Sequence, residues 1–111
     1  IYFNLDKSDI RPDALVELSK MLVVLEDNPT MKIDIRSHTD SRASKAYNER
    51  LSDDRAKSTR AWLIKAGINP NRLTAKGYGE SQLVNKCADG VSCTEQEHQA
   101  NRRSEFIVLE L

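Results

Sequence analysis

The sequence predicts an α+β fold in which two main helices pack on one face of a mixed four-stranded sheet. Short stretches that alternate apolar and polar residues indicate strands, and two longer segments with apolar residues three and four positions apart indicate helices. These segments follow one another in the order βαβαβ(α)β. Placing both helices on one face is the economical way to bury their apolar sides. Because we find no linker, repeat or low-complexity tract, residues 1–111 are expected to form a single domain.

The first half of the chain is expected to hold a strand, a helix and a second strand. Residues 1–5 alternate as a strand does, and Pro12 suits the first position of a helix. That helix should end before Asn28, and its predicted buried stripe consists of Leu15, Leu18, Leu22 and Leu25. Residues 31–36 then alternate again, which indicates a strand with one apolar face.

The second half is expected to hold a long helix and two further strands. The helix should run from about Ser44 to Ala66, and residues 73–77 indicate a third strand. A polar excursion follows, in which Thr94 can cap a short helix. Residues 106–111 are almost wholly apolar, as expected of a strand that is buried on both faces or lies in the middle of the sheet.

Composition argues against several classes of protein. The 17 basic and 17 acidic residues cancel, so no net field attracts nucleic acid or anionic lipid. No apolar run is long enough to span a bilayer, and the chain starts at Ile1 without a signal peptide. We therefore expect part of a longer exported protein, which meets a membrane only through segments outside this chain.

Cys87 and Cys93 are the two cysteines, and the residues between them include the turn signal Asp89-Gly90. A disulfide that closes this loop is the simplest interpretation, and it implies an oxidising compartment. The alternative is a zinc site made by both cysteines and His98. This alternative has no obvious fourth ligand and does not match the usual spacing of zinc ligands.

An arginine in the apolar stripe of the long helix is the most informative feature. Arg55 lies in the middle of a stripe whose core-facing members are expected to be Leu51, Trp62 and Ala66. Arginine is seldom fully buried unless it is paired or reaches solvent. One interpretation is a salt bridge to Asp40 that locks the helix to the sheet. The other is a pocket in which the two side chains match the carboxylate and ammonium of an amino-acid head group.

Five motifs in order resemble the OmpA C-terminal domain family. They are Ser37-His38-Thr39-Asp40, Tyr47-Asn48, Leu51-Ser52 with Arg55-Ala56, Gly77-Tyr78-Gly79-Glu80 and Asn101-Arg102-Arg103. The resemblance covers nearly the whole chain. The family includes the peptidoglycan-associated lipoprotein and the periplasmic part of flagellar stators, and it binds peptidoglycan without cleaving it. The resemblance thus implies a periplasmic domain, without a cofactor or metal, that tethers an outer-membrane-associated protein to the cell wall.

The resemblance also implies a binding site for meso-diaminopimelate in a stem peptide. Asp40 would take the ammonium of its side chain, and Arg55 would take the neighbouring carboxylate. Further contacts or walls are implied for Asn48, Thr39, Asp6, Arg102, Leu51 and Ser52.

Two alternatives to wall binding remain open. An enzyme would use His38 with Asp40 or Ser37, but no nucleophile elbow, metal-ligand set or phosphate loop accompanies them. We therefore predict that the chain is not an enzyme, that His38 is structural and that His98 is a solvated surface residue. The other alternative is a protein-interaction or dimerisation module of the same fold, with weak or no wall binding. Ser37 and Ala43 motivate it, because the family often has glycine at both positions.

Overall fold

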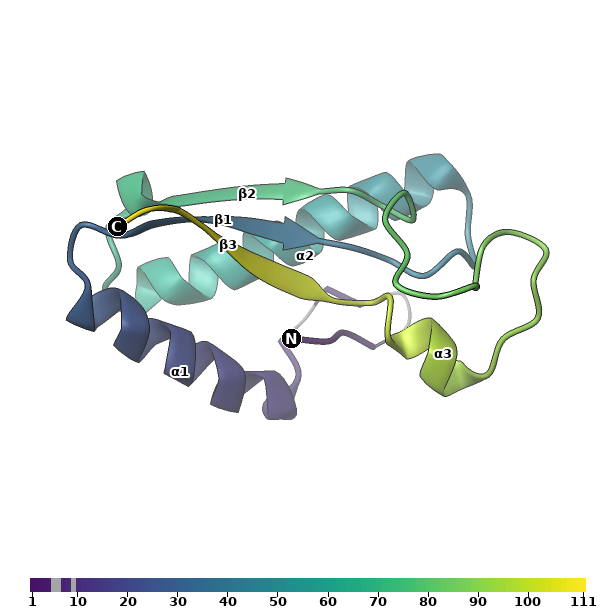
Figure 1. The fold of residues 1–111 in the computed structure, drawn as a ribbon, viewed down its shortest axis with the longest axis horizontal. Helices are drawn as coiled ribbons and strands as arrows, with labels where there is room; N and C mark the ends of the chain where they lie inside the picture. Colours follow the sequence, from purple (N-terminus) through teal and green to yellow (C-terminus); the bar gives the residue numbers. More distant parts are fainter. Residues whose placement is uncertain (5–6, 9) are drawn as a thin grey trace.

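The computed structural model describes residues 1–4, 7–8 and 10–111. Within these residues a three-stranded sheet lies against two longer helices, and a short third helix stands at one end (Figure 1). The elements are α1 (Pro12–Asp27), β1 (Lys32–Ser37), α2 (Lys45–Lys65), the 3-10 turn η1 (Pro70–Arg72), β2 (Leu73–Gly77), α3 (Glu95–Gln99) and β3 (Ser104–Glu110). In the described ranges, no helix combines the length and apolar character that crossing a membrane requires.

The sheet has the order β2-β1-β3, in which β1 runs parallel to β2 and antiparallel to β3. The α+β class and the mixed sheet are therefore confirmed, but the prediction of four strands was wrong. Near the N-terminus, Tyr2 forms an isolated antiparallel bridge with Arg103, and the Phe3 N–H donates to the Arg102 carbonyl at 2.9 Å. This overlap lies just before β3 and forms a single bridge, which is too short for a ladder of strand hydrogen bonds.

Helix α1 begins at Pro12 as predicted, with Asp13 in its first turn, where a negative charge is favourable. Its buried residues are Ala14, Leu18 and Leu25. The predicted stripe was wrong at Leu15, whose side chain is 43% exposed. The helix faces the sheet with the row that runs through positions 14, 18 and 25, so Leu15 points away from it.

Helix α2 begins after Ser44, whose side-chain oxygen accepts a hydrogen bond from the Tyr47 N–H at 3.1 Å. It ends before Gly67, which has a φ of 110° and reverses the chain as a left-handed cap. The expectation that Ala66 faces the core was wrong, because this residue is the exposed C-cap of the helix. Arg55, in the middle of the helix, is completely buried.

Both helices pack on the same face of the sheet, as predicted. Ile33 and Ile35 of β1 belong to one buried cluster together with Leu25 of α1 and Leu63 of α2. Burying a side chain of this kind contributes roughly 1.5–3 kcal/mol. The core thus fixes β1 against both helices, and the end of β1 becomes a rigid base for the loop that follows.

Strand β3 lies at an edge of the sheet rather than in its middle, so the prediction for residues 106–111 was wrong. Val108 is 50% exposed and Leu109 is 51% exposed. Val108 and Leu109 point to opposite faces of the sheet, so the edge position leaves apolar side chains about half exposed on both faces.

Candidate ligand-binding site

The candidate site begins where β1 ends. His38, Thr39 and Asp40 continue the strand and are at most 4% exposed. The His38 N–H donates to the Arg103 carbonyl at 2.8 Å, and the Thr39 N–H donates to the Gly79 carbonyl at 2.9 Å. These bonds tie the segment to the chain on both sides, so Asp40 is held in place by backbone contacts.

Two arginines bind the Asp40 carboxylate. Its Oδ2 lies 2.9 Å from Arg42 Nη2 and 3.0 Å from Arg102 Nη1. The Arg42 backbone N–H donates to Oδ1 at 3.0 Å. Burial alone would raise the pKa of the Asp40 carboxyl, but the hydrogen bonds from Arg42 and Arg102 outweigh it and hold the pKa below its ordinary value. Asp40 is therefore ionised at neutral pH.

Arg55 holds three backbone segments together with its buried guanidinium. It donates to the carbonyls of Lys7 at 2.8 Å, His38 at 3.0 Å and Asn4 at 3.0 Å. The guanidinium carbon also lies 5.1 Å from the centroid of the Phe3 ring. The carboxylate of Asp40 pairs with Arg42 and Arg102 instead, so the interpretation of Arg55 as its salt-bridge partner was wrong.

A small cavity of about 10 Å³ lies where these side chains meet. It is lined by Thr39, Asp40, Arg42, Ala43, Asn48, Leu51, Arg55 and Arg102. Six of the eight predicted ligand-binding residues are in this set. Thr39 Oγ1 is buried and has no hydrogen-bond partner in the described part of the chain. The Asn48 Nδ2 donates to the Ala43 carbonyl at 3.3 Å and to Glu80 Oε1 at 3.4 Å. Asn48 thus links the loop before α2 to the turn after β2 beside the cavity.

Of the other two predicted residues, one is not described by the structure and one lies elsewhere. Asp6 lies outside the described residues. Ser52 faces the turn after β2, where its Oγ accepts from the Gly79 N–H at 2.8 Å and donates to the Glu49 carbonyl at 2.8 Å. A Cβ on Gly77 would approach Ser52 Oγ to 2.3 Å, so glycine is required for this contact between the helix and the turn.

Arg42 and Glu95 are functional candidates that the sequence interpretation missed. The Glu95 carboxylate lies 2.8 Å from Arg42 and 2.7 Å from Arg102, so it joins the two arginines that bind Asp40. Hydrogen bonds from Arg42 and Arg102 lower the pKa of the Glu95 carboxyl. Arg42 could have been found from its position two residues after Asp40. No local pattern points to Glu95, which is 53 residues further along the chain.

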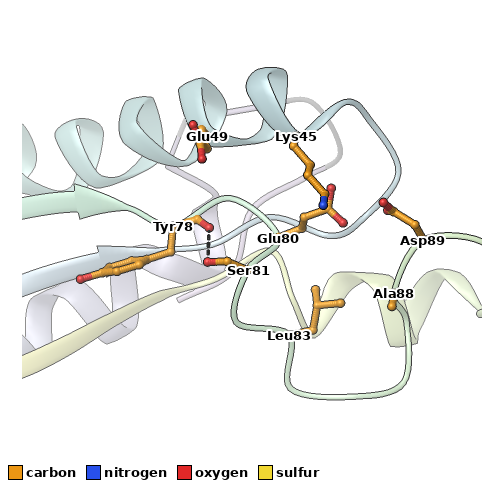
Figure 2. A pocket seen from close by; sticks show the side chains of 8 residues that line it. All are labelled: Lys45, Glu49, Tyr78, Glu80, Ser81, Leu83, Ala88 and Asp89. Atoms are coloured by element: carbon orange, nitrogen blue, oxygen red, sulfur yellow. Dashed lines mark hydrogen bonds between the residues drawn. The ribbon is translucent and has the colours of Figure 1, made fainter.

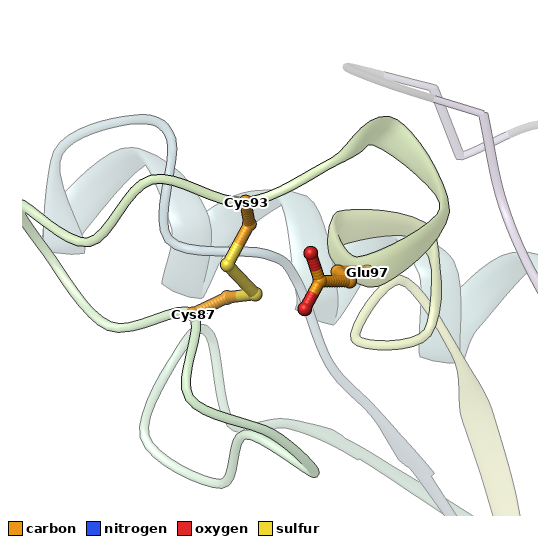
Figure 3. Close-up of side chains that lie close together, drawn as sticks. All are labelled: Cys87, Cys93 and Glu97. Carbon is orange, nitrogen blue, oxygen red and sulfur yellow. A yellow bond between two sulfur atoms is a disulfide. The ribbon is translucent and has the colours of Figure 1, made fainter.

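The segment before α3 is closed by a disulfide between Cys87 and Cys93, as predicted (Figure 3). Both sulfurs are therefore in the disulfide, and neither is a thiolate that could bind zinc, although the Glu97 carboxylate lies beside them. The Ser41 hydroxyl donates to the Cys87 carbonyl, so the disulfide loop supports the loop that carries Asp40.

The other features of this segment are a capped helix and a buried histidine. Thr94 and Glu97 form the predicted capping box of α3. His98 is 7% exposed, so the prediction of a solvated side chain was wrong. Its polar neighbours in the sequence suggested a surface, but the short helix turns this residue inward.

His38 has the features of a structural residue. Its ring stacks on Tyr78 at a centroid distance of 5.6 Å, and its Nε2 lies 3.2 Å from Glu105 Oε1. Burial, together with the positive charge of Arg103, lowers the pKa of His38 from 6.5 to about 4. The ring is therefore neutral at pH 7. Ser37, the other proposed catalytic partner, has its hydroxyl in a hydrogen bond with that of Ser104.

A larger groove of about 360 Å³ lies beside the site (Figure 2). Its lining consists of Lys45, Glu49, Tyr78, Glu80, Ser81, Leu83, Ala88 and Asp89. Burial and a hydrogen bond with Asp89 raise the pKa of the Glu80 carboxyl. Glu80 and Asp89 therefore form an acidic part of the groove lining. The groove also carries charges of both signs, with Lys45 beside Glu80, but Asp40 and Arg55 line the smaller cavity, so we place the candidate site there.

Comparison with known proteins decides the family. The OmpA family model matches residues 2–98. The chain belongs to the OmpA family. As an OmpA-family domain, it is not an enzyme, as predicted. Its periplasmic location agrees with its relatives among outer-membrane proteins and with the disulfide, which persists in an oxidising compartment.

The relatives are longer than this OmpA-family chain. It is 38% identical over 100 residues to the peptidoglycan-associated lipoprotein of Brucella melitensis, a match that covers 90% of this chain and 59% of that protein. It is 36% identical over 108 residues to outer membrane porin F of Pseudomonas fluorescens, covering 97% and 32%. It is also 40% identical over 110 residues to a protein of Gloeobacter violaceus named photosystem I P700 chlorophyll a apoprotein A2, covering 97% and 12%. The chain thus spans between 12% and 59% of the length of these relatives.

The fold has a close counterpart among solved structures. The peptidoglycan-associated lipoprotein of Burkholderia pseudomallei superposes with a TM-score of 0.86 and 24% identity, covering 97% of this chain and 87% of that one. At this level of identity, the likeness shows the OmpA-like fold and does not identify a ligand.

Proposed function

We propose that this domain binds peptidoglycan non-covalently through the meso-diaminopimelate of a stem peptide. The observation that carries the proposal is the convergence of the ionised Asp40 carboxylate and the Arg55 guanidinium on one cavity. A relative that matches 90% of the chain is named as a peptidoglycan-associated lipoprotein, which supports peptidoglycan as the polymer that is bound. The domain would be one part of a longer exported protein, and the other parts would supply the contact with the outer membrane.

In this proposal each charged group of the ligand has a partner of opposite sign. Asp40 takes the ammonium of the diaminopimelate side chain, and Arg55 takes the carboxylate beside it. The Thr39 hydroxyl can bond the ligand, because it lines the cavity and has no other partner in the described residues. Asn48 adds a polar contact from α2. Charge-assisted hydrogen bonds contribute roughly 1.5–3 kcal/mol each, so losing either charged partner should remove most of the affinity.

Weak binding at one site is sufficient for a tether. Stem peptides are repeated along a polymer, and many copies of the domain can engage them at the same time. Linked binding events raise the overall affinity by roughly 10²–10⁴ without any new contact. The proposed role is therefore to hold the parent protein to the cell wall.

The test is a titration of the ¹⁵N-labelled domain with a stem peptide that contains meso-diaminopimelate, beside the same peptide with lysine. We expect shifts centred on Asp40, Asn48, Arg55 and Arg102, with much weaker binding of the lysine peptide, which lacks the second carboxylate. Asp40→Asn and Arg55→Lys should each abolish binding. Lys57→Ala, which removes an exposed cation of α2, is the control. No shift at millimolar peptide would refute the proposal.

The same samples test the alternative of an interaction module. If the fold serves mainly as a dimerisation module, light scattering should give a dimer mass without peptide, and Asp40→Asn should leave that mass unchanged. A monomer that binds the peptide excludes this alternative.

A further inference from the structure

The site is closed in this structure, and the closing group is a side chain of the protein itself. Arg42 approaches the Asp40 carboxylate with two nitrogens, Nη2 at 2.9 Å and Nε at 3.3 Å. A cavity of about 10 Å³ remains beside it, which is close to the volume of a single water probe and far too small for a charged side-chain end of a ligand. The Arg42 guanidinium therefore already occupies the position on Asp40 that a ligand ammonium would take.

The two arginines on Asp40 differ in how firmly they are held. The Arg102 side chain is 3% exposed, and its Nε also donates to the Phe3 carbonyl at 2.8 Å. The Arg42 side chain is 30% exposed, and its hydrogen bonds in the described part of the chain go to Asp40 and Glu95. Arg42 can therefore swing into solvent by breaking one part-buried and one exposed ion pair, whereas Arg102 would also have to break its buried hydrogen bond to the Phe3 carbonyl.

The exchange of one cation for another keeps the charges of the site balanced. Within the ion-paired network of the described residues, Asp40 and Glu95 face Arg42 and Arg102, two charges of each sign. Removing Arg42 from this network takes one of the two paired cations away from the buried Asp40 carboxylate, which is unfavourable. An incoming ammonium restores the balance at the same position. A ligand without this ammonium has no group that can replace Arg42.

We propose that Arg42 is an internal competitor for the ligand's ammonium and thereby a specificity-determining residue of the site. This inference rests on the proposed function. Arg42 occupies the ammonium position on Asp40, and Glu95 holds it there by its outer nitrogen, Nη1, at 2.8 Å. Ligands that carry an ammonium displace it, and ligands that carry only carboxylates do not. The apparent affinity is reduced by the fraction of molecules in which Arg42 closes the site.

The test compares Arg42→Ala with the wild-type domain by calorimetric titration of the meso-diaminopimelate peptide. The pair with Glu95 is exposed, and an exposed ion pair changes an equilibrium by up to about fivefold. The part-buried pair with Asp40 adds to this effect, so losing both pairs should tighten binding on the order of threefold to tenfold. Glu95→Gln should tighten it less, because Arg42 keeps its bonds to Asp40. A peptide whose side-chain ammonium is acetylated should bind weakly to the wild type and gain from Arg42→Ala.

Arg36→Ala is a matched control. Arg36 pairs with Asp34 two residues before it at 2.9 Å, the same spacing as Arg42 and Asp40, but on the strand β1 away from the cavity. Its removal should leave the affinity unchanged. In NMR spectra of the wild type, the Arg42 Nε–H signal should move to its solvent position on saturation with peptide, while that of Arg102 should stay bonded.

The outcomes separate this inference from the proposed function. If the wild type binds and Asp40→Asn does not, but Arg42→Ala binds equally or more weakly, then Arg42 is not a competitor and only this inference fails. If neither the wild type nor Arg42→Ala binds the peptide, both fail. Circular dichroism melting of each variant excludes unfolding as the cause of a lost signal.

Discussion

The guanidinium of Arg102 lies 3.0 Å from the carboxylate of Asp40, and both side chains are at most 5% exposed. This pair joins the segment before β3 to the segment after β1. Two charges at this depth are stable because each has further partners, Arg42 for the carboxylate and the Phe3 carbonyl for the guanidinium. The network that shapes the candidate site is therefore also part of what holds the neighbouring ends of β1 and β3 together.

Replacing Arg102 should destabilise the domain as well as alter the site. Arg102→Met leaves the buried Asp40 carboxylate with Arg42 as its remaining cation and leaves the Phe3 carbonyl without this donor. Breaking a buried pair on one side costs about 3 kcal/mol or more in the free energy of unfolding. Urea unfolding at pH 7 measures this loss. Arg11→Ala, which breaks an exposed pair with Asp13, should cost less than about 1 kcal/mol. Equal losses in the two variants would contradict the prediction.

Arg55 should have a structural role in addition to the proposed binding role. Its guanidinium donates to the carbonyls of Asn4, Lys7 and His38, so Arg55→Leu leaves these groups without a donor from α2. Hydrogen bonds to a charged group contribute roughly 1.5–3 kcal/mol each, and we expect a loss of at least about 2 kcal/mol. Arg55→Lys should lose less, because it keeps the charge. The measurement is thermal and urea unfolding, and an unchanged midpoint for Arg55→Leu would show that the three bonds contribute little.

Features that depend on neighbouring residues could be predicted from the sequence. Strand β2 was found at its observed bounds, and α2 within one residue, because the apolar period, Ser44 and Gly67 are all local signals. The place of β3 in the sheet could not be found in this way. Its apolar composition suits a central strand, but the order of strands is decided by distant pairing, and β1 takes the centre.

The candidate site likewise combines local features, which could be predicted, with long-range contacts, which could not. The motifs around Asp40 and Arg55 are continuous in the sequence, and the structure brings six of the eight predicted residues to one cavity. The contact between Arg42 and Glu95 crosses 53 positions and depends on the disulfide loop folding back, so no local pattern contains it. The carbonyl partners of Arg55 could not be predicted either, because every residue has a backbone carbonyl and the residue type does not show which one accepts a bond.

The stability of the domain should fall as the pH drops from about 6.5 to about 4. The pKa of His38 is lowered from 6.5 to about 4 in the folded state, so the unfolded chain binds more protons in this window. By linkage, the free energy of unfolding then decreases as the pH falls and is largest above pH 6.5. One pKa unit corresponds to 1.36 kcal/mol, which gives a decrease of up to about 3 kcal/mol across the window. Urea unfolding at half-unit steps of pH measures it.

His38→Gln provides the comparison for this pH dependence. The variant lacks the titrating group, so its unfolding free energy should be nearly flat between pH 6.5 and 5. Below about pH 4 both proteins should lose stability together, because the pKa of the Asp40 carboxyl is lowered in the folded state and its contribution disappears on protonation. An identical slope in the two proteins above pH 5 would assign the effect to other groups.

Reduction of the disulfide should loosen one end of the molecule and leave the sheet intact. The loop between Cys87 and Cys93 is short, so closing it contributes on the order of 2 kcal/mol. Its loss should show in two places beyond the loop itself, at Ser41, which bonds the Cys87 carbonyl, and at Glu95, which follows the loop and bonds Arg42. Hydrogen exchange of a Cys87→Ala, Cys93→Ala variant should therefore rise in residues 41–44 and 84–99 while β1 and β2 keep their protection.

The same variant should also change the affinity for the peptide. If the ion pair between Glu95 and Arg42 is weakened, the variant should bind the peptide somewhat more tightly than the oxidised wild type. Weaker binding would instead indicate that the disulfide loop is needed to shape the site.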